Sequence, residues 1–220
     1  MAPIPPPSEW PIPKFSLRID DLAHPGATIF LHAVDPLAAL RDAVVASFTW
    51  LYTLETVPKN VQTVALILRP MEGVAHTTGS KHAKEIHFSL DYILNTAKRA
   101  ADEIRGVLTH EVVHCFQYNA QDSCPGGLIE GIADYVRLRA NLSPPHWKKC
   151  GGGDWDAGYE KTAYFLAWME ERYGDGTVAE LNGCMNGVTY DSRIFKRTTG
   201  RSVEKLWKIY CASLEEQKIQ

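Results

Sequence analysis

The stretch His110-Glu111-Val112-Val113-His114 places two histidines four residues apart. Residues with this spacing lie on one face of an α-helix, so both imidazoles are predicted to point at the same place. We expect the helix to run from Asp102 to Asn119. Its other residues near the histidines are mostly apolar: Val107, Leu108, Val112, Val113 and Phe116. The stretch therefore predicts a largely buried helix whose polar groups need partners.

Two imidazoles that converge from one helix face are typical zinc ligands. A catalytic zinc site uses three protein ligands and leaves the fourth position to water. Glu111 lies between His110 and His114 and can reach that water, so we predict that it is the general base of a hydrolytic reaction. The alternative is a chance coincidence of three polar residues on a solvated helix face, and the apolar flanks disfavour it.

A second helix is expected to supply the third ligand, and the stretch from Gly127 to Asp134 has the apolar neighbours of such a helix. We predict that Glu130 is the ligand. Asp134, one turn further on, is predicted to accept the ring N–H of a ligating histidine, because such histidines usually donate to a carboxylate. Two alternatives stay open: Asp134 is the ligand instead, or both residues are ordinary acids on an exposed helix face.

A resemblance to the basic secretory protein family of plant, fungal and bacterial metallopeptidases is carried by two runs, His110-Glu-Val-Val-His-Cys-Phe-Gln-Tyr-Asn119 and Pro125-Gly-Gly-Leu-Ile-Glu-Gly-Ile-Ala-Asp-Tyr-Val-Arg-Leu138. The likeness continues through Gly73-Val-Ala, Glu85-Ile-His-Phe-Ser89, His146-Trp147, Trp155-Asp-Ala-Gly-Tyr159 and Leu206-Trp207. The chain is also similar to the wider gluzincins, in which a glutamate on a second helix completes the site. The resemblance implies a secreted, zinc-dependent metallopeptidase that hydrolyses peptides or proteins.

The resemblance also implies two further features of the site. One is a tyrosine or histidine beyond the glutamate ligand that stabilises the oxyanion, for which the candidates are Tyr135, His146, Tyr159 and Tyr164. We predict Tyr159; the alternative is that it packs with Trp155 in an aromatic core. The other is a sheet edge that pairs with the substrate backbone, at Glu85–Ser89 or at Gly73–His76, unless both segments simply build the sheet.

The predicted fold is α+β and zincin-like, with a small, mostly antiparallel sheet over the active-site helix and a mainly helical C-terminal half. A chain of 220 residues with 45% hydrophobic composition is long enough for one sizeable core. We expect residues 1–13 to be a proline-rich extended segment and residues 14–220 to be a single domain. The expected strands are 14–19, 28–32, 61–68, 73–77 and 85–89. The expected helices are 35–52, 102–119 and 157–173, with two short closing helices within 190–214.

The net charge of −3 and the absence of a Lys/Arg run argue against nucleic acid or an anionic membrane as a partner. No stretch of eighteen apolar residues is present. The first seven residues lack the basic and apolar regions of a signal peptide. We expect a secreted monomer from which a signal peptide has been removed.

Five cysteines are scattered through the chain without a Cys-x-x-Cys pattern. Two schemes stay open: disulfides Cys115–Cys124 and Cys150–Cys184 with Cys211 free, or five reduced thiols.

A second function also stays open, that of a secreted zinc-binding defence or recognition protein with little or no turnover. Its site would be closed by a fourth protein ligand. The nearest candidate, Cys115, is rotated about 100° from His114 on a helix.

Overall fold

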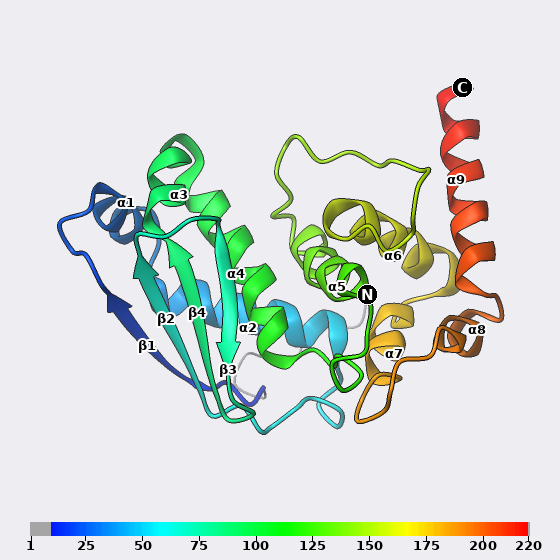
Figure 1. The fold of residues 1–220 in the computed structure, drawn as a ribbon, viewed down its shortest axis with the longest axis horizontal. Helices are drawn as coiled ribbons and strands as arrows, with labels where there is room; N and C mark the ends of the chain where they lie inside the picture. The colour runs from blue at the N-terminus through cyan, green and yellow to red at the C-terminus, as the bar shows by residue number, and fades with distance from the viewer. Residues whose placement is uncertain (1–9, 220) are drawn as a thin grey trace. The chain divides into compact units, whose positions relative to one another are not determined.

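The computed structural model describes residues 10–219 and the side chains of residues 10–216, so most of the proline-rich segment predicted over residues 1–13 lies outside the described residues. The chain divides into two compact units, one ending at Phe116 and one beginning at Gln117. The described residues form nine α-helices, a short 3-10 helix and one four-stranded sheet (Figure 1). The predicted α+β class is confirmed.

The first unit contains the sheet and four of the α-helices. In chain order its elements are β1 (Lys14–Ile19), α1 (Pro25–Ala33), α2 (Pro36–Leu51), β2 (Thr63–Arg69), β3 (Ala75–Gly79), β4 (Ala83–Ser89), α3 (Leu90–Asn95), the 3-10 helix η1 (Ala97–Arg99) and α4 (Ala100–Phe116). The predicted helix 35–52 corresponds to α2, with Asp35 as its N-cap and Pro36 in its first turn.

The sheet has the strand order β1-β2-β4-β3. β1 pairs with β2 and β2 with β4 in parallel, and only β3 and β4 are antiparallel. The prediction of a mostly antiparallel sheet was therefore wrong. The reason is the connection between β1 and β2, which passes through α1 and α2 and so returns the chain in the same direction, as parallel pairing requires.

The predicted strand 28–32 was also wrong, because these residues belong to α1. His24 caps that helix by accepting the N–H of Gly26 at Nδ1, 3.0 Å away, and Pro25 occupies its first turn. A short apolar run bounded by Gly and Pro does not distinguish a strand from a buried helix by its periodicity.

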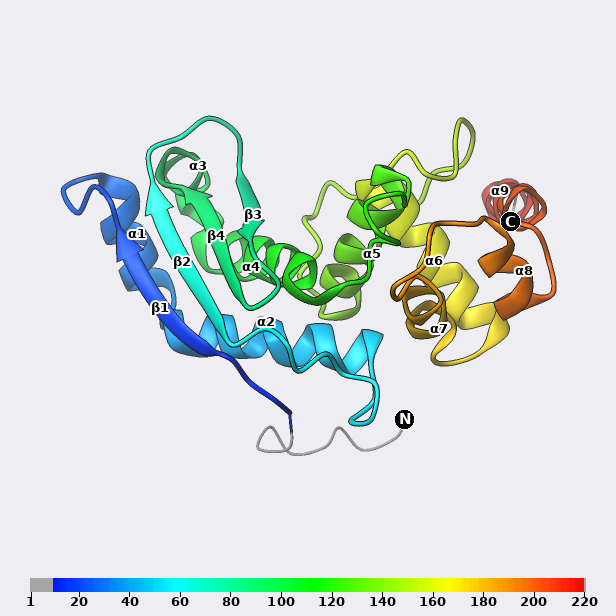
Figure 2. The same cartoon turned by 60° about the horizontal axis from the view of Figure 1, so that its bottom comes forward.

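The core of the first unit lies where α2 and α4 pack side by side against one face of the sheet (Figures 1 and 2). Phe48 of α2 packs edge-on against Phe116 at the end of α4, with ring centroids 4.7 Å apart. Trp10 is buried against the same phenylalanine, with centroids 5.5 Å apart. These aromatic contacts bury large apolar areas and hold the two helices together.

The second unit is helical in the residues that the structure describes. Its helices are α5 (Gly126–Arg139), α6 (Tyr159–Tyr173), α7 (Thr177–Gly183), α8 (Arg193–Thr199) and α9 (Val203–Ile219). The predictions of α6 and of two helices after residue 190 are confirmed, although α9 is long rather than short. α7 was not predicted; its N-terminus is capped by Glu170, which accepts the N–H groups of Gly176 and Val178.

Two glycines one turn apart on α5 allow close packing within the second unit. A Cβ atom at Gly127 would overlap the carbonyl oxygen of Asp156, and one at Gly131 would overlap the side chain of Thr162 on α6. Thr162 in turn accepts the N–H of Gly158 and donates to the carbonyl of Trp155, at 2.9 and 2.8 Å. The glycines therefore bring the segment 155–158 directly against α5.

The glycine-rich loop Gly151–Gly153, which precedes this segment, is held by hydrogen bonds with side chains. Trp207 donates its indole N–H to the carbonyl of Gly153, and Lys161 donates to that of Gly152, both at 2.9 Å. The N–H of Gly152 donates to the sulfur of Cys211 at 3.4 Å. Side chains from α6 and α9 thus fix the path of a loop that its sequence alone does not determine.

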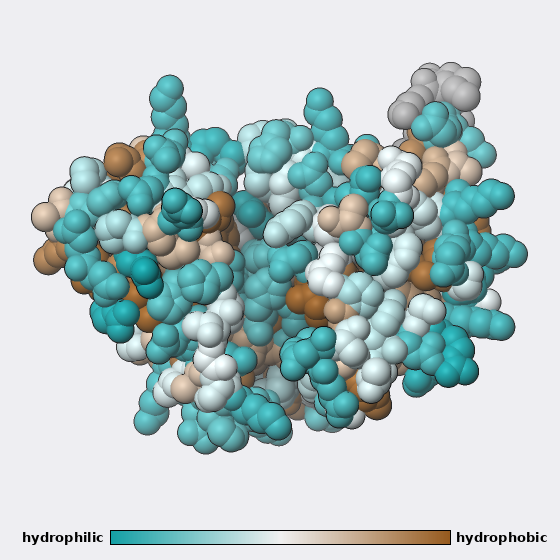
Figure 3. Space-filling view, in the orientation of Figure 1, coloured by the Kyte–Doolittle hydropathy of each residue, from teal (hydrophilic) through white to brown (hydrophobic). Residues whose placement is uncertain are grey.

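The face drawn in Figure 3 is mostly hydrophilic, and its apolar residues form small, separate patches. Among the described residues, the large hydrophobic side chains that are exposed include Leu22, Leu37 and Tyr159. None of the helices described has the length and apolar character needed to cross a membrane.

Gly127→Ala tests the close packing on α5. We expect it to lower the free energy of unfolding by about 1–3 kcal/mol or more, because the added methyl group meets backbone that cannot move aside easily. Gly126→Ala is the matched control, since nothing lies within 4 Å of a Cβ atom there; it should be neutral or raise stability by roughly 0.4–1 kcal/mol. Chemical denaturation of both variants measures the difference, and equal stabilities would contradict the packing described.

Candidate metal centre and active site

Helix α4 carries the two predicted histidine ligands in a buried setting. His110 and Glu111 are buried and His114 is half-buried. The Nε2 atoms of the two histidines lie 3.1 Å apart, and their rings are nearly perpendicular. Two nitrogens bound to one tetrahedral zinc ion at 2.0–2.1 Å would be about 3.3 Å apart. The pair therefore has the spacing of two ligands that share one metal ion.

Contacts at both ends of α4 fix the position of this pair. Near its N-terminus, the buried Glu103 accepts hydrogen bonds from Arg99 at 2.8 Å and from the hydroxyl of Tyr92 at 3.0 Å. At its C-terminus, the hydroxyl of Tyr52 donates to the carbonyl of Phe116 at 2.6 Å. That carbonyl belongs to the last turn, where it lacks a helical partner. The helix is thus held at both ends by groups from its own unit.

The carboxylate of Glu111 is held by a threonine that the sequence analysis did not identify. Thr77 of β3 donates its hydroxyl to Oε2 of Glu111 at 2.7 Å and also lies 2.9 Å from the carbonyl oxygen of the same residue. The two residues are 34 positions apart. The signal that could have pointed to Thr77 is the alternation of β3, which directs every second side chain to the α4 face of the sheet.

Helix α5 carries the two predicted acids. Glu130 is half-buried, and Asp134, one turn further along the same face, is 2% exposed. The start of the helix is fixed by Gln117, which donates its side-chain N–H to the carbonyl of Ile129 at 3.1 Å. His110, His114 and Glu130 form a group that could hold a metal ion. Two imidazoles and one carboxylate are a donor set that zinc accepts.

Tyr159 is the first residue of α6 and has an unusual backbone conformation. Its φ angle is +47°, and it follows Gly158, whose φ is +88°. A left-handed conformation is strained for a bulky residue, and such strain is concentrated at functional sites. Tyr159 is 58% exposed, so it does not lie in an aromatic core. Trp155 packs edge-on against Phe195, with centroids 5.1 Å apart.

Gly158 also relates Tyr159 to the predicted glutamate ligand within the second unit. A Cβ atom at Gly158 would lie 3.7 Å from the Cβ atom of Glu130. A side chain at position 158 would therefore meet Glu130, and glycine leaves that space open. The packing of segment 155–158 on α5 brings the two residues near one another although they are far apart in the chain.

A family model described as BSP, peptidase of plants and bacteria, matches residues 12–210. The chain belongs to this family. The resemblance to the basic secretory protein family is thereby confirmed, and the match includes residues of both compact units. No curated protein and no solved structure matches the chain.

Two segments of this BSP-family chain were predicted as the sheet edge that pairs with substrate, and the strand order excludes one of them. β4 pairs with β2 on one side and with β3 on the other, so Glu85–Ser89 is not an edge and that candidate was wrong. β3, over Ala75–Gly79, is the edge strand on this side of the sheet and overlaps the second candidate, Gly73–His76. An edge strand offers unpaired N–H and C=O groups to an extended peptide.

All five cysteines are free thiols, so of the two schemes left open by the sequence, the disulfides Cys115–Cys124 and Cys150–Cys184 were wrong. Cys115 follows His114 on α4 and is buried, and its thiol lies 3.7 Å from the carbonyl oxygen of Glu111. Burial raises the pKa of this thiol to about 12. Within the described residues, the group that could hold a metal ion consists of His110, His114 and Glu130, and Cys115 is not part of it.

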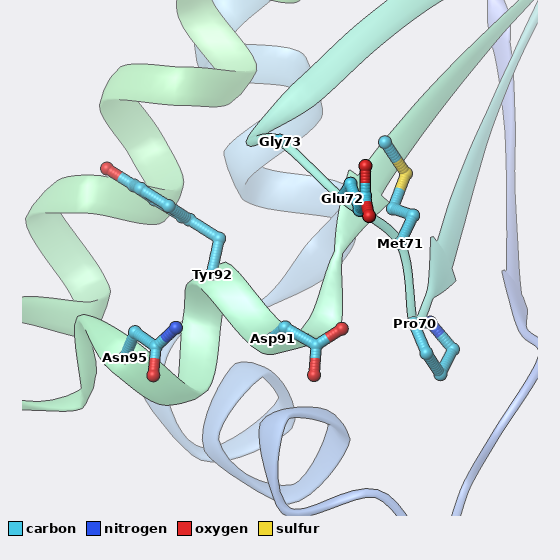
Figure 4. A pocket seen from close by; sticks show the side chains of 7 residues that line it. All are labelled: Pro70, Met71, Glu72, Gly73, Asp91, Tyr92 and Asn95. Atoms are coloured by element: carbon cyan, nitrogen blue, oxygen red, sulfur yellow. The ribbon is translucent and has the colours of Figure 1, made fainter.

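The first unit also has a surface pocket, and none of the candidate metal ligands or the candidate base lines it. It is formed by Pro70, Met71, Glu72, Gly73, Asp91, Tyr92 and Asn95 (Figure 4). The ring of Tyr92 extends away from the two carboxylates, and its hydroxyl binds Glu103. Tyr92 thus links the pocket to Glu103, which helps to hold α4. We assign the pocket no chemistry.

Proposed function

We propose that the chain is a zinc-dependent metallopeptidase of the gluzincin type. His110, His114 and Glu130 would hold the metal ion. The observation that carries this proposal is the 3.1 Å separation of the two imidazole Nε2 atoms on α4, beside a buried glutamate and within a three-residue group that could bind a metal. Membership of a family described as peptidases supports the reaction class.

Zinc in such a site polarises the carbonyl group of the substrate and lowers the pKa of a water molecule to near 7. The protein would then supply the proton acceptor. Glu111 is the candidate, because it lies between the two ligands and its carboxylate is held in place by Thr77. In the proposed step an O–H bond of the attacking water breaks and its proton passes to Glu111 as the oxygen attacks the scissile carbonyl carbon.

Two further residues have proposed roles. Asp134 would accept the second ring N–H of a ligating histidine, which fixes the tautomer and orientation of the ring. Tyr159 would donate its phenol hydrogen to the developing oxyanion. Its exposure, its strained backbone and the closeness of position 158 to Glu130 support this role.

The number of candidate ligands supports catalysis over a purely structural site. Structural zinc sites are usually closed by four protein ligands, whereas catalytic sites use three. Within the described part of the chain, the group that could hold a metal contains three residues. Among the described residues no fourth ligand joins the group, so the observation does not favour the alternative function, a zinc-binding defence or recognition protein with little turnover.

We propose that residues 14–220 act as one peptidase domain, because the family match over residues 12–210 includes most of both compact units. We further propose that the protein is secreted and monomeric and that its substrates are peptides or proteins. The peptidase description of the family supports this substrate class.

Glu111→Gln tests the general base. We expect the variant to bind zinc as the wild type does but to lose about 10²–10⁴-fold in kcat, because its amide cannot accept the water's proton. Cleavage of a peptide library and elemental analysis of bound zinc measure the two properties. Glu180→Gln, an exposed position on α7, is the control and should be fully active. Activity of the Glu111 variant near the wild-type rate would exclude this role.

Glu130→Ala and Asp134→Ala test the assignment of ligand and supporting carboxylate. We expect the first to lose more zinc affinity, because loss of a supporting carboxylate typically costs only about 10–100-fold. Competition with a chromogenic chelator gives both affinities, and melting of the metal-free proteins shows whether either variant is unfolded. The opposite ranking would make Asp134 the ligand.

Tyr159→Phe tests the oxyanion donor. Removal of one fully engaged donor costs roughly 10²–10³-fold in kcat, whereas zinc content and KM should change little. Tyr173→Phe, at the other end of the same helix and outside the set of candidate donors, is the matched control and should retain kcat. An unaltered kcat in the Tyr159 variant would show that this phenol does not stabilise the transition state.

A further inference from the structure

Thr77 lies on the edge strand β3 and faces α4. Its neighbours in the strand, His76 and Thr78, are exposed, and strand geometry directs them to the opposite face of the sheet. Thr77 itself is half-buried and makes its hydrogen bonds to Glu111. The strand therefore presents one hydroxyl to the active-site helix.

The hydroxyl of Thr77 has one hydrogen and two nearby acceptors in Glu111. The contact to the carboxylate oxygen Oε2, at 2.7 Å, is shorter than that to the backbone carbonyl, at 2.9 Å. Hydrogen bonds to a charged acceptor are shorter and roughly twice as strong as those between neutral groups. The carboxylate is thus the preferred acceptor.

The bond also distinguishes the two oxygens of Glu111. Among the side chains of residues 10–216, it is Thr77 that hydrogen-bonds this carboxylate, and it does so at Oε2. A glutamate side chain has three rotatable bonds, and a bond at one oxygen restricts all of them. With Oε2 held, Oε1 is the oxygen that remains to accept a proton.

We propose that Thr77 is a positioning residue for Glu111. By donating to Oε2, it fixes the orientation of the carboxylate and leaves Oε1 to receive the proton of the attacking water. This inference rests on the proposed peptidase function. Thr77 does not itself touch the water or the substrate; it acts through the position of Glu111, and a misplacement of about 1 Å in such a group can cost about 10²-fold in rate.

Thr77→Val tests this role because valine has nearly the same shape but no hydroxyl. In the zinc-loaded enzyme we expect kcat to fall by about 10–100-fold, with KM and zinc content close to those of the wild type. Thr77→Ser keeps the hydroxyl and should restore kcat to within a few-fold of the wild type. Thr78→Val is the matched control: it makes the same change one residue further along β3, on the opposite face, and should leave kcat unchanged.

A second measurement does not depend on activity. In the metal-free protein, Thr77→Val should lower the melting temperature by roughly 2–4 °C, through loss of the bond to the carboxylate. In a Glu111→Ala background, which retains the backbone carbonyl but not the carboxylate, the same substitution should have a clearly smaller effect. An equal effect in both backgrounds would mean that Thr77 serves only the backbone of α4, and would overturn the inference.

The kinetic outcomes separate this inference from the function on which it rests. An active wild type whose kcat survives Thr77→Val overturns the positioning role alone. A zinc-loaded wild type that cleaves no peptide overturns the proposed function and the positioning role with it. A loss of kcat in Thr77→Val that is restored in Thr77→Ser supports both.

Discussion

The short distance between two imidazole nitrogens on α4 is the constraint on which the candidate site depends. Two Nε2 atoms 3.1 Å apart cannot both carry a proton without directing two N–H groups at one another. Neutral rings at this distance share either one hydrogen or one metal ion. Such an arrangement persists only if the helix that carries the rings is held firmly, because side-chain and backbone freedom would otherwise separate them.

The first unit provides that support from several directions. The aromatic pair Phe48 and Phe116 binds the end of α4 to α2, and Tyr52 occupies a terminal carbonyl that would otherwise be unsatisfied. Glu103 holds the N-terminal end of α4 by accepting hydrogen bonds from the charged Arg99 and the neutral Tyr92. β3 adds a hydrogen bond from the sheet to the carboxylate between the two histidines. The helix is therefore positioned by packing along its length and by hydrogen bonds near its functional residues.

In the second unit, the main structural feature is the close packing of the loop segment 155–158 against α5. Gly127 and Gly131 remove the side chains that would separate α5 from segment 155–158, and Thr162 bonds to both ends of that segment. The chain then enters α6 through two consecutive left-handed residues, Gly158 and Tyr159. The side chain of Tyr159 is exposed rather than buried in the aromatic core.

The sequence by itself determined the features that arise from contacts within one helical turn or one strand. The spacing of His110 and His114, the Asp35-Pro36 start of α2 and the apolar run Val64–Leu68 of β2 are local patterns, and each predicted its element. The tertiary structure alone decided the direction of strand pairing, the interior position of β4 and the bond from Thr77 to Glu111. The physical reason is that backbone N–H and C=O groups are the same at every residue, so a strand does not specify its partner. That choice depends on the helices that connect the strands and on the side chains that pack between them, which only the folded chain brings together.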